Sequence, residues 1–191
     1  MKKIHIITVV ISIVVILIIS ATFFIFYDKD QEISAIEGKI LADEIAQDWN
    51  SSVGLVRVNL MTSIGGTDNG LAQAWGFSYN CNASSIGFAV TIFSNGSYVC
   101  SEVEPPTPYR INNWTIDSDE AFEIAKSNPE IKGWLDDHRN AVVQSMTLTA
   151  GPTSTSWGIA WFDSGFIDDP HTAVIGLNAT TGEITNVYIQ N

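Results

Sequence analysis

The residues that could carry chemistry in this sequence are few, and most of them stand alone. His5 lies in an apolar stretch, His138 follows a helical pattern and His171 falls in a turn, so no two histidines have the spacing of metal ligands on one element. The one acidic group near a histidine consists of Asp163, Asp168, Asp169 and His171. Such a loop could bind Ca²⁺ or Zn²⁺, but a solvated acidic surface is the commoner interpretation. We expect no metal and no cofactor.

No motif of a known catalytic machinery is present. The sequence lacks a Gly-x-Ser-x-Gly elbow, a His-Glu-x-x-His pair and a phosphate-binding glycine loop. The paired carboxylates Asp43-Glu44 and Asp136-Asp137 fall in helical patterns, where they form exposed faces. We therefore predict that the protein is not an enzyme, and a hydrolase built on Asp163, Asp168 and His171 is the weakest hypothesis.

The two cysteines, Cys81 and Cys100, are the candidates for a disulfide. A bond between them would close a loop of about 20 residues and contribute roughly 3 kcal/mol to stability. A simple meander of strands at 73–81, 87–94 and 97–104 would keep the two thiols apart. The disulfide therefore requires another strand order, and the alternatives are pairing between two chains or free thiols.

Five Asn-x-Ser/Thr sequons are candidates for glycosylation, at Asn50, Asn82, Asn95, Asn113 and Asn178. The alternative is that Asn, Ser and Thr are simply common in turns. The sequence also contains six tryptophans. Trp75, Trp157 and Trp161 lie in strand patterns and are expected to fill a core. Trp114, beside a sequon, is a candidate aromatic residue of a binding surface.

An apolar segment near the N-terminus predicts a membrane anchor. Residues 4–27 contain no Asp, Glu, Lys or Arg, and 24 residues exceed the roughly 20 that a helix needs to cross a bilayer. A cleavable signal peptide is the alternative, but the apolar run continues past its only candidate cleavage site, Ser20-Ala21. Lys2 and Lys3 precede the segment, so we expect a single-pass protein of the cell membrane with a cytoplasmic tip (1–3) and an extracytoplasmic C-terminal part.

The charge of the expected outer part limits its partners. All 21 acidic residues and seven of the nine basic ones lie beyond Tyr27, which leaves a net charge of −14 on that part. Nucleic acids and anionic lipid head groups are recognised by clustered Lys and Arg, so both are excluded as partners. Contact with the membrane is expected only through residues 4–27, and the oligomeric state is not predicted.

The elements expected beyond the anchor follow one plan twice. A helical pattern over 31–49 precedes several strand patterns, and together they form a first unit at 31–104. A Pro-rich linker at 105–115 leads to a second unit at 116–191, which again places helical residues before strands. Four residue pairs match in order: Ile45-Ala46 with Ile124-Ala125, Trp75-Gly76 with Trp157-Gly158, Ala89-Val90 with Ala173-Val174, and Gly96 with Gly182. We therefore predict an α+β fold, with an N-terminal transmembrane helix followed by two tandem helix-plus-antiparallel-sheet repeats.

Residues 116–190 resemble a PepSY domain, a small cystatin-like module of peptidase propeptides and envelope proteins. The resemblance rests on the helix opening at 116–125, on the break Asn128-Pro129-Glu130, on the tryptophan strand from Ser156 and on the closing turn at 177–184. Asn178 replaces the aspartate that is usual in the family. The first unit resembles the module only through the internal match. The resemblance implies a structural module without an active site, and modulation or inhibition of a peptidase as one activity.

The leading hypothesis is therefore a membrane-anchored, extracytoplasmic interaction module that binds another envelope or secreted protein, such as a peptidase. Strand edges and the face of a sheet offer surfaces for an extended peptide. The alternative is a sensor that binds a small ligand in an apolar, tryptophan-lined pocket between the two repeats.

Overall fold

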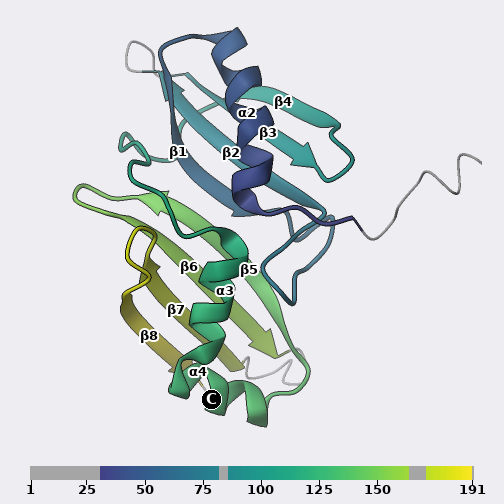
Figure 1. The fold of residues 1–191 in the computed structure, drawn as a ribbon, viewed down its shortest axis with the longest axis vertical. Helices are drawn as coiled ribbons and strands as arrows, with labels where there is room; N and C mark the ends of the chain where they lie inside the picture. The colour runs from purple at the N-terminus through teal and green to yellow at the C-terminus, as the bar shows by residue number, and fades with distance from the viewer. Residues whose placement is uncertain (1–30, 82–85, 164–170, 191) are drawn as a thin grey trace, which may run out of the picture. The chain divides into compact units, whose positions relative to one another are not determined.

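The computed structural model describes residues 31–81, 86–163 and 171–190. In this part of the chain, helical residues precede four strands in each of two groups (Figure 1). The first group consists of α2 (Ala35–Trp49), β1 (Val53–Leu60), β2 (Ala74–Cys81), β3 (Gly87–Phe93) and β4 (Tyr98–Val103). The second group consists of α3 (Ser118–Ser127), α4 (Pro129–Asp137), β5 (Ala141–Ala150), β6 (Thr155–Asp163), β7 (His171–Asn178) and β8 (Ile184–Gln190).

The sheet contradicts the fold class predicted from the sequence. Its eight strands follow the order β4-β3-β2-β1-β5-β6-β7-β8, and each neighbouring pair is antiparallel. β1 pairs with β5 through Arg57↔Thr149, Val58↔Leu148 and Asn59↔Thr147, so strands of both groups belong to one sheet. The described part of the chain is therefore predominantly β, with three short helices, and the prediction of two helix-plus-sheet repeats is wrong.

The pairing of β1 with β5 has a physical cause that hydrophobic patterns do not reveal. The edge of a sheet exposes unpaired backbone N–H and C=O groups. Two separate four-stranded sheets would have four such edges, whereas the continuous sheet has two, at β4 and β8. Side-chain alternation along a strand specifies which face is buried, but it carries no information about which edge pairs with which.

The residue pairs that match in the sequence lie at similar places within this one sheet. Trp75-Gly76 lies in β2 and Trp157-Gly158 in β6, while the two Ala-Val pairs lie in β3 and β7. Gly96 and Gly182 precede β4 and β8, with φ of 79° and 72°. A left-handed backbone of this kind favours glycine, which explains both glycines in the sequence.

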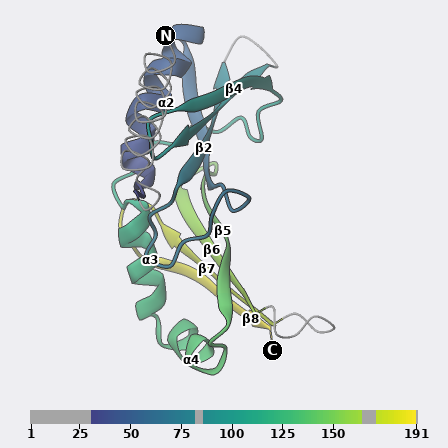
Figure 2. The same cartoon turned by 90° about the vertical axis from the view of Figure 1, so that its right-hand side faces the viewer.

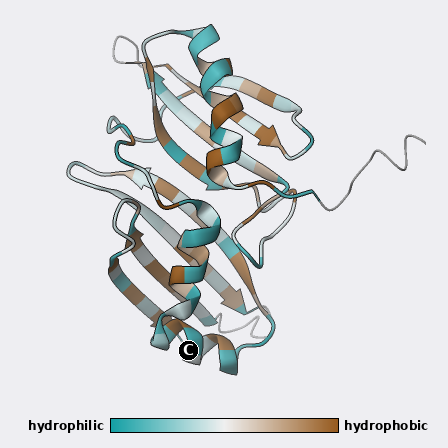
Figure 3. Cartoon of the chain, viewed as in Figure 1, coloured by the Kyte–Doolittle hydropathy of each residue, from teal (hydrophilic) through white to brown (hydrophobic). Residues whose placement is uncertain are grey.

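The helices all cover one face of the sheet, as Figure 2 shows. Figure 3 shows hydrophobic positions along the strands and polar positions over much of the helices. The core lies between these two layers, and its largest fully buried side chains include Trp75, Phe77, Phe122, Met146, Trp157 and Ile159. The expected core positions Trp75, Trp157 and Trp161 are all buried. We call the opposite side of the sheet the helix-free face.

The first helix lies close to the sheet because its buried residues are small. Its buried positions are Ala35, Gly38, Ala42 and Ala46. A Cβ atom added at Gly38 would lie 3.1 Å from the Phe77 ring, so even a methyl group there would press against that ring. Ser34 caps the helix through a capping box with Glu37, which satisfies N–H groups that the first turn leaves without intrahelical partners.

The start of α3 also caps the start of α2. Asp117 is the N-cap of α3, and its carboxylate accepts hydrogen bonds from Ser118 N at 2.6 Å and from Ile36 N at 3.0 Å. The buried Ser118 hydroxyl accepts another from Ala35 N at 3.0 Å. The sequence predicts a capping box between Asp117 and Glu120, but the carboxylate instead serves two helix N-termini, whose dipoles both favour a negative charge.

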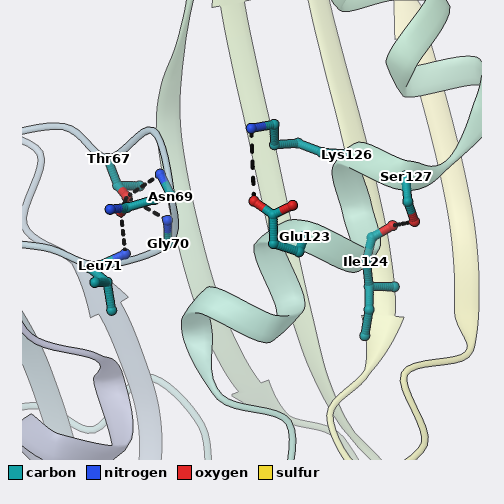
Figure 4. A network of polar contacts seen from close by, with 8 residues as sticks. All are labelled: Thr67, Asn69, Gly70, Leu71, Glu123, Ile124, Lys126 and Ser127. Carbon is teal, nitrogen blue, oxygen red and sulfur yellow. Dashed lines mark hydrogen bonds and ion pairs between the residues drawn. The ribbon is translucent and has the colours of Figure 1, made fainter.

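The loop between β1 and β2 packs its backbone against α3. Thr67 and Asn69 order this loop by hydrogen bonds to the backbone of Gly70 and Leu71, at 2.7 Å and 2.9 Å (Figure 4). Gly70 has a φ of 84°, and a Cβ atom there would lie 2.5 Å from Asp119 Cα. Only glycine therefore fits at this contact between the two groups of elements.

The predicted membrane anchor at residues 4–27 lies outside the described residues. Among the helices that the structure does describe, none has both the length and the apolar character needed to span a bilayer. Residues 32–191 form one compact unit. Within it, the Pro-rich segment lies along β1, where Ile111 N donates to Leu55 O at 2.7 Å.

Candidate functional site

The structure brings His138 and His171 together, which the sequence does not predict. His138 follows α4, and its Nδ1 lies 2.8 Å from Trp134 O. Its Nε2 lies 2.7 Å from Nδ1 of His171, the first residue of β7. Asp163, at the end of β6, is opposite His171 and is only 3% exposed, so it is not part of a solvated loop. Asp168 and Asp169 lie outside the described residues.

The hydrogen bonds of the histidine pair define the tautomers of the two neutral rings. A carbonyl oxygen only accepts, so His138 Nδ1 must donate to Trp134 O. Nε2 of the neutral His138 ring is then an acceptor, and His171 Nδ1 donates the hydrogen bond between the two rings. Within the described residues, no group of three or more His, Cys, Asp and Glu side chains could hold a metal ion. The pair thus links α4 to β7.

The strand order separates the two cysteines. Cys81 ends β2 and is buried, whereas Cys100 lies in β4 and is exposed, with β3 between them. Two strand spacings amount to about 9.6 Å, beyond the separation of about 4.4–6.8 Å between the Cα atoms of a disulfide. The two described residues are thiols here, and the disulfide expected between them is incompatible with this meander. Cys81 Sγ accepts a hydrogen bond from Asn50 Nδ2 at 3.4 Å.

The four described sequons differ in accessibility. Asn95 is exposed in the turn before β4, and Asn113 is exposed with a φ of 53°. Asn178 is half-buried, and its Oδ1 accepts hydrogen bonds from Thr180 N and Thr181 N. Asn50 is half-buried and bonded to Cys81, so its Nδ2 is a poor acceptor for a glycan. Asn82 lies outside the described residues, and glycosylation stays a prediction.

Trp114 is half-buried and borders a groove. Its indole N–H donates to Ile116 O at 2.8 Å, and its ring packs edge-on against Trp157 at 5.9 Å. The groove has a volume of about 360 Å³ and is lined by Ile36, Lys39, Ile111, Asn113 and Trp114. Trp75 and Trp157 pack against each other at 6.1 Å and are fully buried, so neither indole borders this groove.

A buried phenol lies beneath α2. Tyr79 is 2% exposed and donates a hydrogen bond from its hydroxyl to Asp43 Oδ1 at 2.8 Å. Burial, together with the negative charge of Asp43, raises the pKa of the Tyr79 phenol far above its ordinary value. Lys39 pairs with the same carboxylate. The phenol is therefore neutral at any physiological pH and is a hydrogen-bond donor that holds α2 on β2.

The edge strand β4 is the most exposed strand of the first group. Five of its six residues are exposed and Val103 is half-buried, with Tyr98 at 52% and Val99 at 63% exposed. Phe93 N donates to Ser97 O, so in the antiparallel ladder that follows, alternate residues bond to β3. The N–H and C=O groups of Tyr98, Cys100 and Glu102 consequently point away from the sheet. We call this surface the β4 edge.

The sequence predicts the strand that contains the β4 edge, but it does not predict that this strand is exposed. The run Tyr98-Val99-Cys100 is apolar and predicts a strand next to the Asn95-Gly96 turn. The strand at the end of a meander need not be the edge of the whole sheet. Only the pairing of β1 with β5, at the other side of the first group, leaves β4 at an edge. The polar residues Ser101 and Glu102 in β4, compared with Thr91 alone in β3, are a weak signal of that exposure.

A scan against models of known protein families finds no match, and a search of curated proteins finds no similar sequence. Among solved structures, the fold is similar to the crystal structure of a putative lipoprotein from Clostridium difficile 630, with a TM-score of 0.53. The match covers 86% of this chain and 98% of that chain at 13% sequence identity. At this identity the likeness shows the fold alone. The resemblance to the PepSY family stays a prediction.

Proposed function

We propose that this chain is a membrane-associated, extracytoplasmic and non-enzymatic interaction module, which holds an extended segment of another envelope or secreted protein along the β4 edge. One observation carries the proposal: among the described residues, β4 is an edge strand without a partner on its outer side, and it exposes the large side chains of Tyr98 and Val99. Soluble proteins normally protect such an edge with charges, proline or a covering element. An added strand would pair its backbone with Tyr98, Cys100 and Glu102.

The side chains next to the β4 edge offer specific contacts to the side chains of an added strand. Tyr98, Cys100 and Glu102 lie on the side of α2, because Cys100 is opposite the buried Val90. Glu102 Oε1 accepts a hydrogen bond from Trp49 Nε1 at 3.3 Å, and Trp49 stacks on Phe88. In β-strand addition, backbone hydrogen bonds supply affinity while side-chain contacts of this kind supply specificity.

The proposed location rests on the sequence and on the solved relative. Residues 4–27 have the composition of a membrane-spanning helix, and Lys2 and Lys3 favour a cytoplasmic N-terminus. The structurally similar protein is described as a putative lipoprotein, a class that is attached to membranes. A reporter enzyme that is active only outside the cytoplasm, fused after Asn191, should be active. A reporter active only in the cytoplasm would refute this location.

The edge hypothesis is tested by removing one outward N–H group. Cys100→Pro deletes the outward donor, and proline is tolerated on an edge strand, whereas Cys100→Ala keeps the donor and serves as the control. A photo-crosslinking amino acid at Tyr98 of the full-length chain would capture neighbouring proteins in intact cells. We expect Cys100→Pro to lose a product that the wild type and Cys100→Ala both give. Equal products from all three chains would refute the edge as the binding site.

The PepSY resemblance suggests a secreted or envelope peptidase as the partner. In that case the purified full-length chain should slow cleavage of a peptide substrate by the captured peptidase, and Cys100→Pro should slow it less. A captured protein without peptidase activity would remove the peptidase from the proposal and leave the interaction module in place.

The groove beside Trp114 favours a second candidate function, the binding of a small ligand. It combines an indole, apolar side chains and Lys39, which suits a small molecule with an apolar body and a negative group. Such a ligand should change the fluorescence of the wild type more than that of Trp114→Phe. A ligand panel that leaves fluorescence and thermal stability unchanged would count against this candidate.

A further inference from the structure

The centre of the helix-free face carries small and polar side chains and few charges. One row of facing residues crosses seven strands of it: Ser101, Ala89, Ser78, Arg57, Thr149, Ser156 and Asn178. The neighbouring row contains only small or polar side chains around Asn59, including Gly76, Thr91, Thr147 and Gly158. This surface has few bulky groups and can approach another surface closely.

Arg57 is the one charged side chain that the described strands place on this face. The other acidic or basic strand residues are Glu102, Asp163 and His171, which lie on the side of the helices. Arg57 is opposite Ser78 on β2 and Thr149 on β5, at the centre of the sheet where the two groups of strands join. Arg57 therefore places a cation at the middle of a sheet face to which the described strands contribute no other charge, on a strongly acidic protein.

The guanidinium of Arg57 makes no hydrogen bond or ion pair with any residue that the structure describes, and its Nε is buried. A guanidinium carries five N–H donors, and leaving a buried one unpaired costs free energy. Arg110 shows the contrast. It lies over Gly54 on the same face, and it donates to Asn80 Oδ1 at 3.2 Å and to Ser52 O at 2.7 Å. Arg110 has a structural role, whereas the buried Nε–H of Arg57 has no acceptor among the described residues.

We infer that Arg57 binds a carboxylate, an Asp or Glu side chain presented by a protein partner that lies across the helix-free face. The planar fork of a guanidinium matches a carboxylate, with which it forms two parallel hydrogen bonds. The Ser78 and Thr149 hydroxyls lie on the neighbouring strands, at the cross-strand spacing that brings them next to the same carboxylate. Arginines at the centre of an interface commonly contribute most to affinity.

A protein is the favoured occupant because of the shape and charge of this region. Gly, Ala, Ser and Thr around Arg57 form a surface without large projections, which suits the surface of another protein. The net charge of the outer part, −14, disfavours nucleic acids and anionic membranes, which carry many negative charges. A single carboxylate can bind a single guanidinium on a negatively charged protein, because this contact depends on the charges close to Arg57. The assignment rests on the proposed function for the existence of a protein partner, but it concerns a different surface from the β4 edge.

The first test observes Arg57 directly. The full-length ¹⁵N-labelled chain, in detergent, is titrated with a capped peptide that contains one Glu, with the same peptide containing Gln, and with inorganic phosphate. We expect the Nε–H resonance of Arg57 to shift with the Glu peptide only, while that of Arg110 stays in place as an internal control. No shift with the Glu peptide, or an equal shift with the Gln peptide, would overturn the assignment. An equal shift with phosphate would indicate a general anion site and would also overturn it.

The second test repeats the crosslinking experiment at Tyr98 with variants of Arg57. Because Arg57 has no partner to lose, Arg57→Gln should fold with an unchanged or higher Tm. It should weaken binding of the captured partner by about tenfold or more, as expected for removing one member of a charge pair. Arg57→Lys keeps the charge without the fork and should recover only part of the affinity. If Cys100→Pro abolishes capture while Arg57→Gln binds normally, the proposed function stands and the inference about Arg57 fails.

Discussion

At the scale of single residues, Tyr79 shows how a buried polar group holds a helix on the sheet. Its ring belongs to the core, and its hydroxyl reaches the carboxylate of Asp43 on α2. The phenol must stay protonated to donate this hydrogen bond. Burial disfavours the charged phenolate, and ionisation would also place a second negative charge beside Asp43, which is why the pKa of the phenol is raised.

The raised pKa predicts a loss of stability in alkaline solution. Below about pH 10 both the folded and the unfolded chain hold the phenol proton, so this contribution is constant. Above that value the unfolded chain ionises while folded Tyr79 does not, and stability falls by about 1.4 kcal/mol per pH unit. Urea unfolding at about pH 8 and about pH 11 should show a larger loss for the wild type than for Tyr79→Phe. Equal losses would contradict the raised pKa.

The two thiols should differ in reactivity with iodoacetamide. Cys100 is exposed on the β4 edge, whereas Cys81 is buried and accepts a hydrogen bond from Asn50. We expect one alkylation in the native protein and two after unfolding without reductant, measured by mass spectrometry of the intact chain. Cys100→Ala should give no native alkylation. If neither thiol were alkylated in the native or unfolded chain before reduction, and both were alkylated after reduction, the two cysteines would form a disulfide. That result would contradict the strand order.

Sequence reasoning at this scale succeeded where packing decides and failed where distant segments meet. Trp75 and Trp157 alternate with small or polar residues, so their burial follows from strand periodicity. His138 and His171 are 33 positions apart, and their 2.7 Å contact depends on where α4 ends relative to β7. Nothing in the spacing of the two histidines carries that information. The same holds for Arg57, whose missing partner is a property of the assembled sheet.

At the scale of elements, helix caps are the feature that local sequence predicts best. Asn128-Pro129 has the pattern of an N-cap followed by proline in the first turn, and Asn128 caps α4 in the structure. Its Oδ1 accepts hydrogen bonds from Glu130 N at 3.0 Å and from Ile131 N at 3.2 Å. Such a cap depends on residues within one turn, so neighbours in the sequence are sufficient to identify it.

Asn128→Ala should therefore lower the free energy of unfolding by about 1 kcal/mol, the usual loss for an N-cap. Because α4 leads to His138, the variant should also loosen the link between His138 and His171. Hydrogen exchange of the α4 amides should accelerate more than that of α2. A matched control is Gln47→Ala on the exposed side of α2, for which we expect a change within about 0.5 kcal/mol. An unchanged exchange rate in α4 would contradict the role of the cap.

Strands and turns were also largely predictable, but their assembly was not. The Asn95-Gly96 turn and the alternating strand patterns identify a meander in each group. The pairing of β1 with β5 involves only three residue pairs, and two of them, Arg57↔Thr149 and Asn59↔Thr147, lie on the polar face. The hydrophobic pattern of a sequence gives no information about a pairing that is made by the backbone groups of residues with polar side chains. The predicted fold class was wrong because it did not include the pairing of β1 with β5.

At the scale of the whole molecule, two contacts at the start of α3 help to hold the two groups together. Asp117 and Ser118 cap the start of α2 from the start of α3. Gly70 places the backbone of the β1–β2 loop against the same helix start. Both contacts converge on the N-terminus of α3, so this point couples the stability of one group of elements to that of the other.

Gly70→Ala should destabilise the protein by about 3 kcal/mol, because it adds a left-handed alanine and an overlap with backbone atoms that cannot move easily. Gly66→Ala is the control, since a Cβ atom at Gly66 would meet nothing within 4 Å. Urea unfolding should show a single transition for both variants, with a lower midpoint only for Gly70→Ala. Equal midpoints would show that the loop does not pack on α3 in solution.

A sheet that ends in two open edges can also grow. β4 and β8 lie seven strand spacings apart, or about 34 Å, so each edge is accessible while the other is occupied. Copies joined edge to edge would form a ribbon of unlimited length. The net charge of −12 opposes this self-association, and dissolved salt weakens that repulsion. Light scattering of a concentrated sample should therefore increase with ionic strength, and Cys100→Pro should delay that increase.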